Sequence, residues 1–166
     1  MGPSYATAAT LSMSNATATA VLQTVEIYVS LVPAVGESVA AAQFQVNIPP
    51  ELAFLNVVAG DMALEAGKDI TFSVMNDSSL LVIVMGFNQN TISSGELAVL
   101  TVQVRADAVS GLAPVSISNA LLSTPVGTSA PVTTENGSVL IDKGGEFPFP
   151  VGNKTVYYIA CILVTL

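Results

Sequence analysis

Apolar and polar residues alternate with a period of two in many stretches of the chain, a pattern typical of β-strands with one buried face. Residues 42–48 show it most clearly, because the even positions are apolar and the odd positions carry amide side chains. Residues 80–85 are apolar throughout, as in a strand that is covered on both faces. The pattern predicts nine strands, over residues 9–13, 25–31, 42–48, 52–58, 70–74, 80–85, 97–104, 113–118 and 138–141.

Turn-forming residues separate these segments, and little in the sequence favours helices. Gly, Pro, Asn and Asp cluster between the predicted strands. Asn136-Gly137 is typical of a tight turn between antiparallel strands. One short helix is expected over residues 61–68, ended by Gly67. Short strands joined by turns predict an all-β fold, a nine-stranded antiparallel β-sandwich with jelly-roll topology.

The 166 residues fit one domain with less regular segments at both ends. Residues 1–6 are expected to be a flexible lead-in, residues 7–142 the sandwich, and residues 143–155, rich in Gly and Pro, a linker. Residues 156–166 are apolar but too few to span a bilayer, so they are either a final strand or the first part of a C-terminal membrane anchor. No signal peptide is recognised in residues 1–23.

Composition excludes most catalytic and nucleic-acid-binding functions. The chain has no histidine, which removes Ser-His-Asp and Cys-His nucleophile systems and zinc sites with a nitrogen ligand. Its single cysteine cannot form an internal disulfide or a cysteine-rich metal cluster. Four basic residues against twelve acidic ones give a net charge of −8, which is unsuited to binding a phosphate backbone. No enzyme activity, cofactor or nucleic-acid partner is therefore predicted.

Acidic residues and glycosylation motifs are the remaining local signals. The acidic residues that cluster in sequence are Glu51, Asp61, Glu65 and Asp69. Without an Asp-x-Asp-x-Asp-Gly array they are expected to be solvated surface groups rather than a calcium site. Asn-x-Ser/Thr motifs, which are either glycan acceptors or chance matches in a chain rich in Ser and Thr, occur at Asn15, Asn76, Asn136 and Asn153. The whole pattern favours an extracellular protein, secreted or attached to the cell surface.

One face of the predicted sheet is the most informative surface. The strand over residues 42–48 has a neutral side made of Ala41, Gln43, Gln45 and Asn47. In the strand over residues 80–85, the residues expected to point inward with Phe44 are Leu81, Ile83 and Met85. The outward residues would then be Leu80, Val82 and Val84. Neutral amides beside three aliphatic side chains indicate a protein-docking surface, unless a loop or the C-terminal strand covers them.

Four segments, taken in order, resemble the cohesin domain, the receptor module of cellulosomes and related extracellular assemblies. The first resembles the family's strand, turn, strand and closing Gly-Asp, and the second resembles its Gly-x-x-Ala-x-Ile/Leu-x-x-x-Val strand. The last two resemble its final strands. The segments are residues 42–61 (AQFQVNIPPELAFLNVVAGD), 95–106 (GELAVLTVQVRA), 113–117 (APVSI) and 136–141 (NGSVLI). The resemblance extends over residues 7–142.

This resemblance implies a jelly roll that binds a dockerin, a small helical module, on one sheet face. Calcium would sit on the dockerin, so no metal is implied in this chain. The residues implied to contact the partner are Ala41, Gln43, Gln45, Met75, Val82, Val84, Phe87 and Asn90. Several depart from the family pattern: Ala41 and Gln43 stand in place of Asn and Asp. Met75 replaces a Tyr, Phe87 an acidic residue and Asn90 a Gly.

Two other functions stay open from the sequence. A structural or adhesive cell-surface domain is one, in which residues 156–166 would complete a neighbour's open sheet edge by strand exchange. Weak carbohydrate binding is the other, with Tyr28 as the best isolated candidate because the chain has no tryptophan. A membrane is expected as a partner only through the possible C-terminal anchor.

Overall fold

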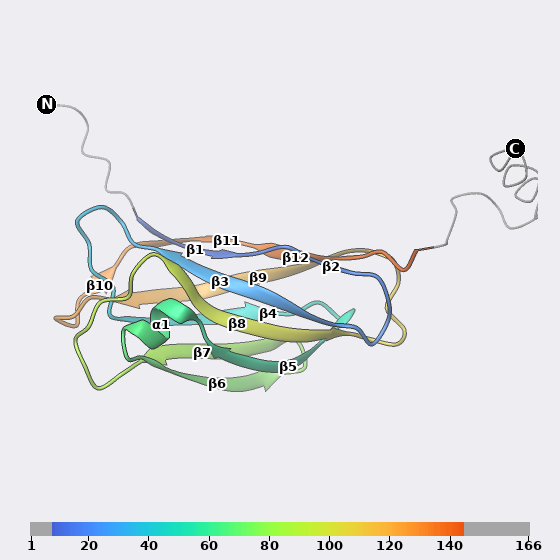
Figure 1. The fold of residues 1–166 in the computed structure, drawn as a ribbon, viewed down its shortest axis with the longest axis horizontal. Coiled ribbons are helices and arrows are strands. Elements are labelled where there is room, and N and C mark those ends of the chain that lie inside the picture. The colour runs from blue at the N-terminus through green and yellow to red at the C-terminus, as the bar shows by residue number, and fades with distance from the viewer. Residues whose placement is uncertain (1–7, 145–166) are drawn as a thin grey trace, which may run out of the picture.

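The computed structural model describes residues 8–144, which form two β-sheets packed face to face (Figure 1). The sheet nearer the viewer in Figure 1 has five strands in the order β11-β1-β3-β8-β5. The other has seven strands, in the order β2-β12-β9-β4-β7-β6 with β10 also paired to β9. The β-sandwich expected from the sequence is confirmed, and we call its layers the five-stranded and the seven-stranded sheet.

The strands of the five-stranded sheet are β11 (Val132–Glu135), β1 (Ala9–Met13), β3 (Thr24–Val32), β8 (Gly95–Val104) and β5 (Leu52–Ala59). Those of the seven-stranded sheet are β2 (Ala16–Ala18), β12 (Gly137–Ile141), β9 (Gly111–Ser123), β4 (Ala41–Asn47), β7 (Ser79–Met85), β6 (Asp69–Asn76) and β10 (Ser129–Ala130). The short helix α1 (Asp61–Glu65) connects β5 to β6. All nine predicted strands are therefore present, and the helix is found where the sequence places it.

Three strands were not expected from the sequence. β2, β10 and β11 have only two to four residues each and consist mostly of small or polar side chains, so they show no alternation. The sheets are also mixed rather than wholly antiparallel, because β1 pairs with β11 and β2 pairs with β12 in parallel. Those two parallel pairs arise where the chain passes twice from one sheet to the other at the same edge of the sandwich.

The turn predicted at Asn136-Gly137 is wrong. β11 and β12 belong to different sheets, so the chain crosses between the layers at this dipeptide instead of reversing in a hairpin. The Asn136 side chain serves the crossing, because its Oδ1 accepts a hydrogen bond from the backbone N–H of Ile117 at 3.1 Å. Gly137 is buried against the segment in which the chain passes from β1 to β2 and so crosses between the sheets for the first time. A Cβ on Gly137 would overlap the carbonyl oxygen of Ser14 in that segment.

The core lies between the two sheets and is almost entirely aliphatic. Alternate residues of β3, β4 and β8 are buried, as their sequence pattern predicts. Phe44 of β4 is fully buried in the layer between the sheets. Among the described residues, Lys68 is the one buried residue with a formal charge. The polar side chains of the sheets therefore face outward and form the surfaces discussed below.

Candidate protein-docking face

The outer surface of the seven-stranded sheet carries the amide side chains of β4. Cross-strand neighbours share a face, so the β4–β7 register places Gln43 beside Ile83 and Gln45 beside Leu81. We define the docking face as the outward residues of β4, β6, β7 and the C-terminal half of β9. They are Ala41, Gln43, Gln45, Asn47, Asp69, Thr71, Ser73, Leu81, Ile83, Met85, Ser116, Ser118, Asn119 and Leu121.

The orientation predicted for β7 is wrong. Leu80, Val82 and Val84 have exposed fractions of 1%, 0% and 0%. They lie in the core because Val82 pairs with Phe44, whose side chain points inward. The residues of β7 that reach the outer surface are Leu81, Ile83 and Met85. Val82 and Val84 are therefore not available to contact a partner, and the aliphatic part of the docking face belongs to their neighbours.

Neutral hydrogen bonds fix the half of the docking face formed by β4 and β9. Asn47 Nδ2 donates to Ser118 Oγ at 2.9 Å and to Ser116 Oγ at 3.2 Å. Asn119 Nδ2 donates to Gln45 Oε1 at 3.0 Å. The backbone of Asn119 has a φ of 49° at an irregularity in the β4–β9 pairing, which turns its side chain toward β4. These amides are oriented before any partner arrives, which lowers the conformational entropy lost on binding.

Aliphatic side chains form the remainder of the docking face. Leu81 and Ile83 are half-buried at its centre, and Met85 and Leu121 are 49% and 56% exposed around them. Asp69, at the start of β6, is the one charged residue of the face. The face thus combines oriented neutral hydrogen-bonding groups with accessible apolar area and carries almost no charge.

The other three predicted contact residues are dispersed. Phe87 follows β7, at the end of the docking face marked by Met85, and its side chain is fully exposed (107%). Met75 is 57% exposed but lies at the far end, because β6 runs antiparallel to β7. Asn90 lies outside the face: its Nδ2 donates to the carbonyl oxygen of Ala66 at 3.1 Å, and it lines a polar hollow of about 470 Å³ beside α1. Of the three, Phe87 is the one next to the Met85 end of the docking face.

Comparison with known protein families agrees with this architecture. The sequence model of the cohesin domain matches residues 9–141. The chain belongs to the cohesin family. A search of curated proteins finds no relative of this cohesin domain.

Solved cohesin structures share its fold. It is similar to the sixth cohesin of scaffoldin B from Acetivibrio cellulolyticus, in complex with a Cel5 dockerin variant, with 20% identity, TM-score 0.72, and 81% of this chain and 99% of that chain covered. A non-cellulosomal cohesin from the archaeon Archaeoglobus fulgidus has 15% identity, TM-score 0.69, and coverage of 92% and 98%. The Coh-OlpA domain of Clostridium thermocellum, in a type I cohesin–dockerin complex, has 16% identity, TM-score 0.71, and coverage of 81% and 99%.

A buried lysine holds the loop that carries Phe87. Lys68, 2% exposed, lies between α1 and β6, and its Nζ donates to Asn88 Oδ1 at 2.7 Å and to the Asn88 carbonyl oxygen at 3.1 Å. Asn88 Nδ2 in turn donates to the carbonyl oxygen of Gly67 at 2.9 Å. We call this the Lys68–Asn88 clamp. No local sequence pattern indicates this clamp, because a lysine in a polar segment is normally a surface residue.

We expect Lys68→Met to loosen this loop, residues 86–94, while the sandwich stays folded. The variant loses both hydrogen bonds of the ammonium group, but it also removes a charge that is costly to bury, so the net change in stability is small. Hydrogen exchange followed by mass spectrometry should show amides of the loop exchanging about tenfold faster or more. Lys143→Met is the matched control, because Lys143 also donates to a carbonyl oxygen, that of Ala108 at 2.9 Å, away from this loop. Equal exchange in the two variants would contradict the clamp.

The same variant tests the titration of Lys68. Burial lowers the pKa of Lys68 below its usual 10.5. The unfolded chain therefore binds more protons than the folded one between the lowered pKa and 10.5, so this residue makes the free energy of unfolding rise with pH across that window. At neutral pH both states are protonated and the slope vanishes. Urea unfolding from neutral to alkaline pH should show this rise in the wild type relative to Lys68→Met.

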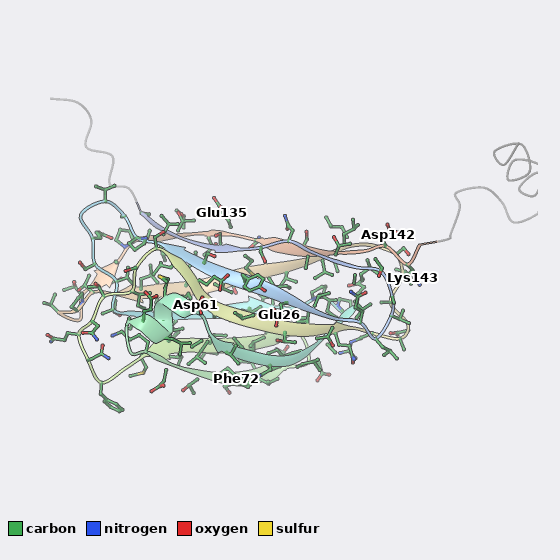
Figure 2. The ribbon with its side chains drawn as sticks, in the orientation of Figure 1. Glu26, Asp61, Phe72, Glu135, Asp142 and Lys143 are labelled. Carbon is green, nitrogen blue, oxygen red and sulfur yellow. The ribbon has the colours of Figure 1, made fainter. Side chains whose placement is uncertain are left out.

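The acidic side chains do not assemble into a metal site in the described part of the chain, which agrees with the expectation that Glu51, Asp61, Glu65 and Asp69 are surface groups. Glu26, Asp61, Glu135 and Asp142, for example, lie far apart in different parts of the fold (Figure 2). Between residues 8 and 144, no three His, Cys, Asp or Glu side chains are grouped as a metal site requires. Tyr28 lies on the outer surface of the five-stranded sheet and donates to Glu26 Oε2 at 2.9 Å; this hydrogen bond and the Glu26 charge raise the pKa of Tyr28. No second aromatic ring pairs with it there, since its partner in β8 is Val99.

Several sequence expectations concern exposed or undescribed segments. Asn15, Asn76 and Asn136 are exposed, which keeps them available as glycan acceptors, whereas Asn153 lies outside the described residues. Residues 1–6, the linker beyond residue 144 and the apolar residues 156–166 also lie outside them. None of the helices within residues 8–144 has the length and apolar character to cross a bilayer.

Proposed function

We propose that this cohesin domain is a non-catalytic extracellular receptor module that binds a dockerin-type module on the docking face and so helps to assemble surface or polysaccharide-degrading complexes. The observation that carries the proposal is the outer face of the seven-stranded sheet, where accessible aliphatic residues lie beside amides already fixed by hydrogen bonds. Membership in the cohesin family supports it, and two of the similar structures are cohesins in complex with dockerins.

The chemistry of the face defines the partner surface that fits it. With Asp69 as its only charge, the face offers little to a basic or acidic partner. A complementary surface is apolar at its centre, opposite Leu81 and Ile83, and carries neutral donors and acceptors opposite Gln43 and Gln45. Binding of such a partner should depend weakly on salt concentration, because screening acts on charge pairs.

Phe87 is the strongest anchor in this proposal. A fully exposed aromatic side chain buries a large apolar area when it enters a pocket, and such residues are frequent hot spots of interfaces. The Lys68–Asn88 clamp fixes the loop next to Phe87, so less loop entropy is lost on binding. The partner should therefore present an apolar pocket at the Met85 end of the docking face.

Calorimetry of the folded domain against a panel of calcium-loaded dockerins tests the proposal. We expect at least one dockerin to bind. Ile83→Asp places an unpaired charge at the centre of the contact and should weaken binding by about tenfold or more, and Phe87→Ala by a similar factor. Val58→Asp, at a 46% exposed position of the five-stranded sheet, is the control and should bind as the wild type does. If no dockerin binds, or if Ile83→Asp and Val58→Asp bind equally, the proposed function is wrong.

A further inference from the structure

The two sheets end unequally on the side of the sandwich formed by β5 and β6. The five-stranded sheet ends at β5, whereas the seven-stranded sheet continues past β7 to β6. Figure 1 shows β6 extending beyond β5 at the lower edge of the molecule. β5 and β6 approach each other at several residues, among them Phe54 and Phe72, whose rings pack edge to face with their centroids 5.3 Å apart. Beyond this pair, no described strand lies over β6.

The inward side of β6 is consequently left open to solvent. Phe72 and Val74 pair with the core residues Val82 and Leu80, so they are on the side of β6 that faces into the sandwich. They are nevertheless 39% and 56% exposed. Figure 2 shows Phe72 at the lower edge of the molecule. The sandwich thus lacks the strand that would cover these two side chains.

The edge of β5 next to this space is suited to pairing with a strand. β8 pairs with one edge of β5, and no described strand pairs with the other. The backbone groups of Leu52 are already bonded to Pro49 and Arg105, so the donors and acceptors without a strand partner on this edge are those of residues 53–59. β5 and the part of β6 after Asp69 contain no charged residue, and neither strand contains proline. Native proteins normally protect long edge strands with charged residues or prolines, or keep the edge strand very short. β5 has eight residues and contains neither a charged residue nor a proline, so it lacks these protections.

A cleft of about 230 Å³ lies at one end of this space, lined by residues of β5, β6 and β7 and by Arg105. Its walls include Phe54, Val74 and Leu80. The charged residue Asp77 also lines it, so the cleft is not wholly apolar.

We propose that the β5–β6 cleft binds an extended peptide strand of a partner protein, which adds to the free edge of β5 and covers Phe72 and Val74. The backbone of the peptide pairs with β5, and its alternate side chains are aliphatic and pack on Phe72 and Val74. This site is separate from the docking face, because Phe72 and Val74 are on the opposite side of β6 from Thr71 and Ser73.

Backbone complementarity favours a peptide as the occupant. A lipid or another apolar small molecule would cover the side chains but leave the β5 donors and acceptors unpaired, which strand addition does not. A second copy of the domain fits poorly for a steric reason. Antiparallel pairing of two β5 edges about a twofold axis perpendicular to the sheets would bring both overhanging β6 strands into the same space. A single strand avoids that collision.

Fluorescence anisotropy with a synthetic probe tests this site in the full chain. The probe is an acetylated and amidated peptide of alternating valine and serine, 8 residues long to match β5. We expect it to bind the wild type. Val74→Asp should weaken binding of the probe by about tenfold or more. Ser73→Asp is the control and should not weaken it, because Ser73 is adjacent to Val74 in β6 but faces the docking side. The same peptide N-methylated at alternate residues should not bind, because it cannot pair as a strand.

Hydrogen exchange identifies the edge that is occupied. Bound peptide should protect the backbone amides of β5 that point to its free edge. The Ile83→Asp variant should still bind the peptide even if it no longer binds a dockerin. Absence of binding by the unmethylated probe, equal binding of both probes, or insensitivity to Val74→Asp would each overturn the proposal. A dimer in sedimentation experiments that protects β5 without peptide and is dissociated by Val74→Asp would overturn it too, since a second copy would then be the occupant.

Discussion

Val84→Asp is expected to unfold the domain, whereas Ile83→Asp, one residue earlier in β7, is expected to leave it folded. Val84 is fully buried in the core and pairs with Ala42 and Ile70 on the inward side of the sheet. A carboxylate there would lose its hydration without gaining a partner, which costs several kcal/mol. The lost burial of the valine side chain costs about 1.5–3 kcal/mol more. The sum is comparable with the whole stability of a domain, about 5–15 kcal/mol.

Ile83→Asp has the opposite expectation because the side chain lies on the docking face. A carboxylate at this half-buried outer position keeps water around it, so the change in unfolding free energy should be about 1 kcal/mol. Circular dichroism and thermal unfolding of the two variants provide the measurement. A Val84→Asp protein that melts cooperatively near the wild-type temperature would mean that β7 has the opposite face in the core.

The sequence predicts β4 fully and β7 only in part, for a physical reason. In β4 the amide side chains alternate with apolar ones, so burial of the apolar set determines both faces. From Leu80 to Met85, β7 has no polar residue, and either set of alternate side chains is equally suited to the core. The choice is made by the register with β4, which places Val82 opposite Phe44 and is a tertiary contact.

Features formed by residues distant in sequence were likewise not predictable. The Lys68–Asn88 clamp joins residues twenty positions apart, and neither residue has a local pattern that indicates burial. The β5–β6 cleft results from the unequal width of the two sheets, which no single strand encodes. Phe87 remains a prediction that rests on the family resemblance, in which it stands in place of an acidic residue.

Gly137→Ala is expected to destabilise the domain strongly. The dipeptide Asn136-Gly137 has the composition of a hairpin turn, but its glycine is needed for space and not for a positive φ. An added Cβ would overlap the carbonyl oxygen of Ser14 and lie 2.9 Å from Met13 Cβ. Two of the three nearest atoms belong to the backbone of the β1–β2 crossing, so rotation of a side chain cannot relieve the overlap.

The two crossings must therefore separate, which strains the parallel pairs on both sides of them. We expect a loss of about 3 kcal/mol in unfolding free energy and a fall of about 10 °C in Tm. Gly127→Ala is the matched control, since Gly127 has a φ of +81° but nothing within 4 Å of an added Cβ. Its expected cost is about 1 kcal/mol, from backbone strain alone. Equal Tm values for the two variants would show that the crossings have room for a side chain at position 137. The presence of glycine after Asn136 would then have to be explained by its backbone conformation, as in a hairpin.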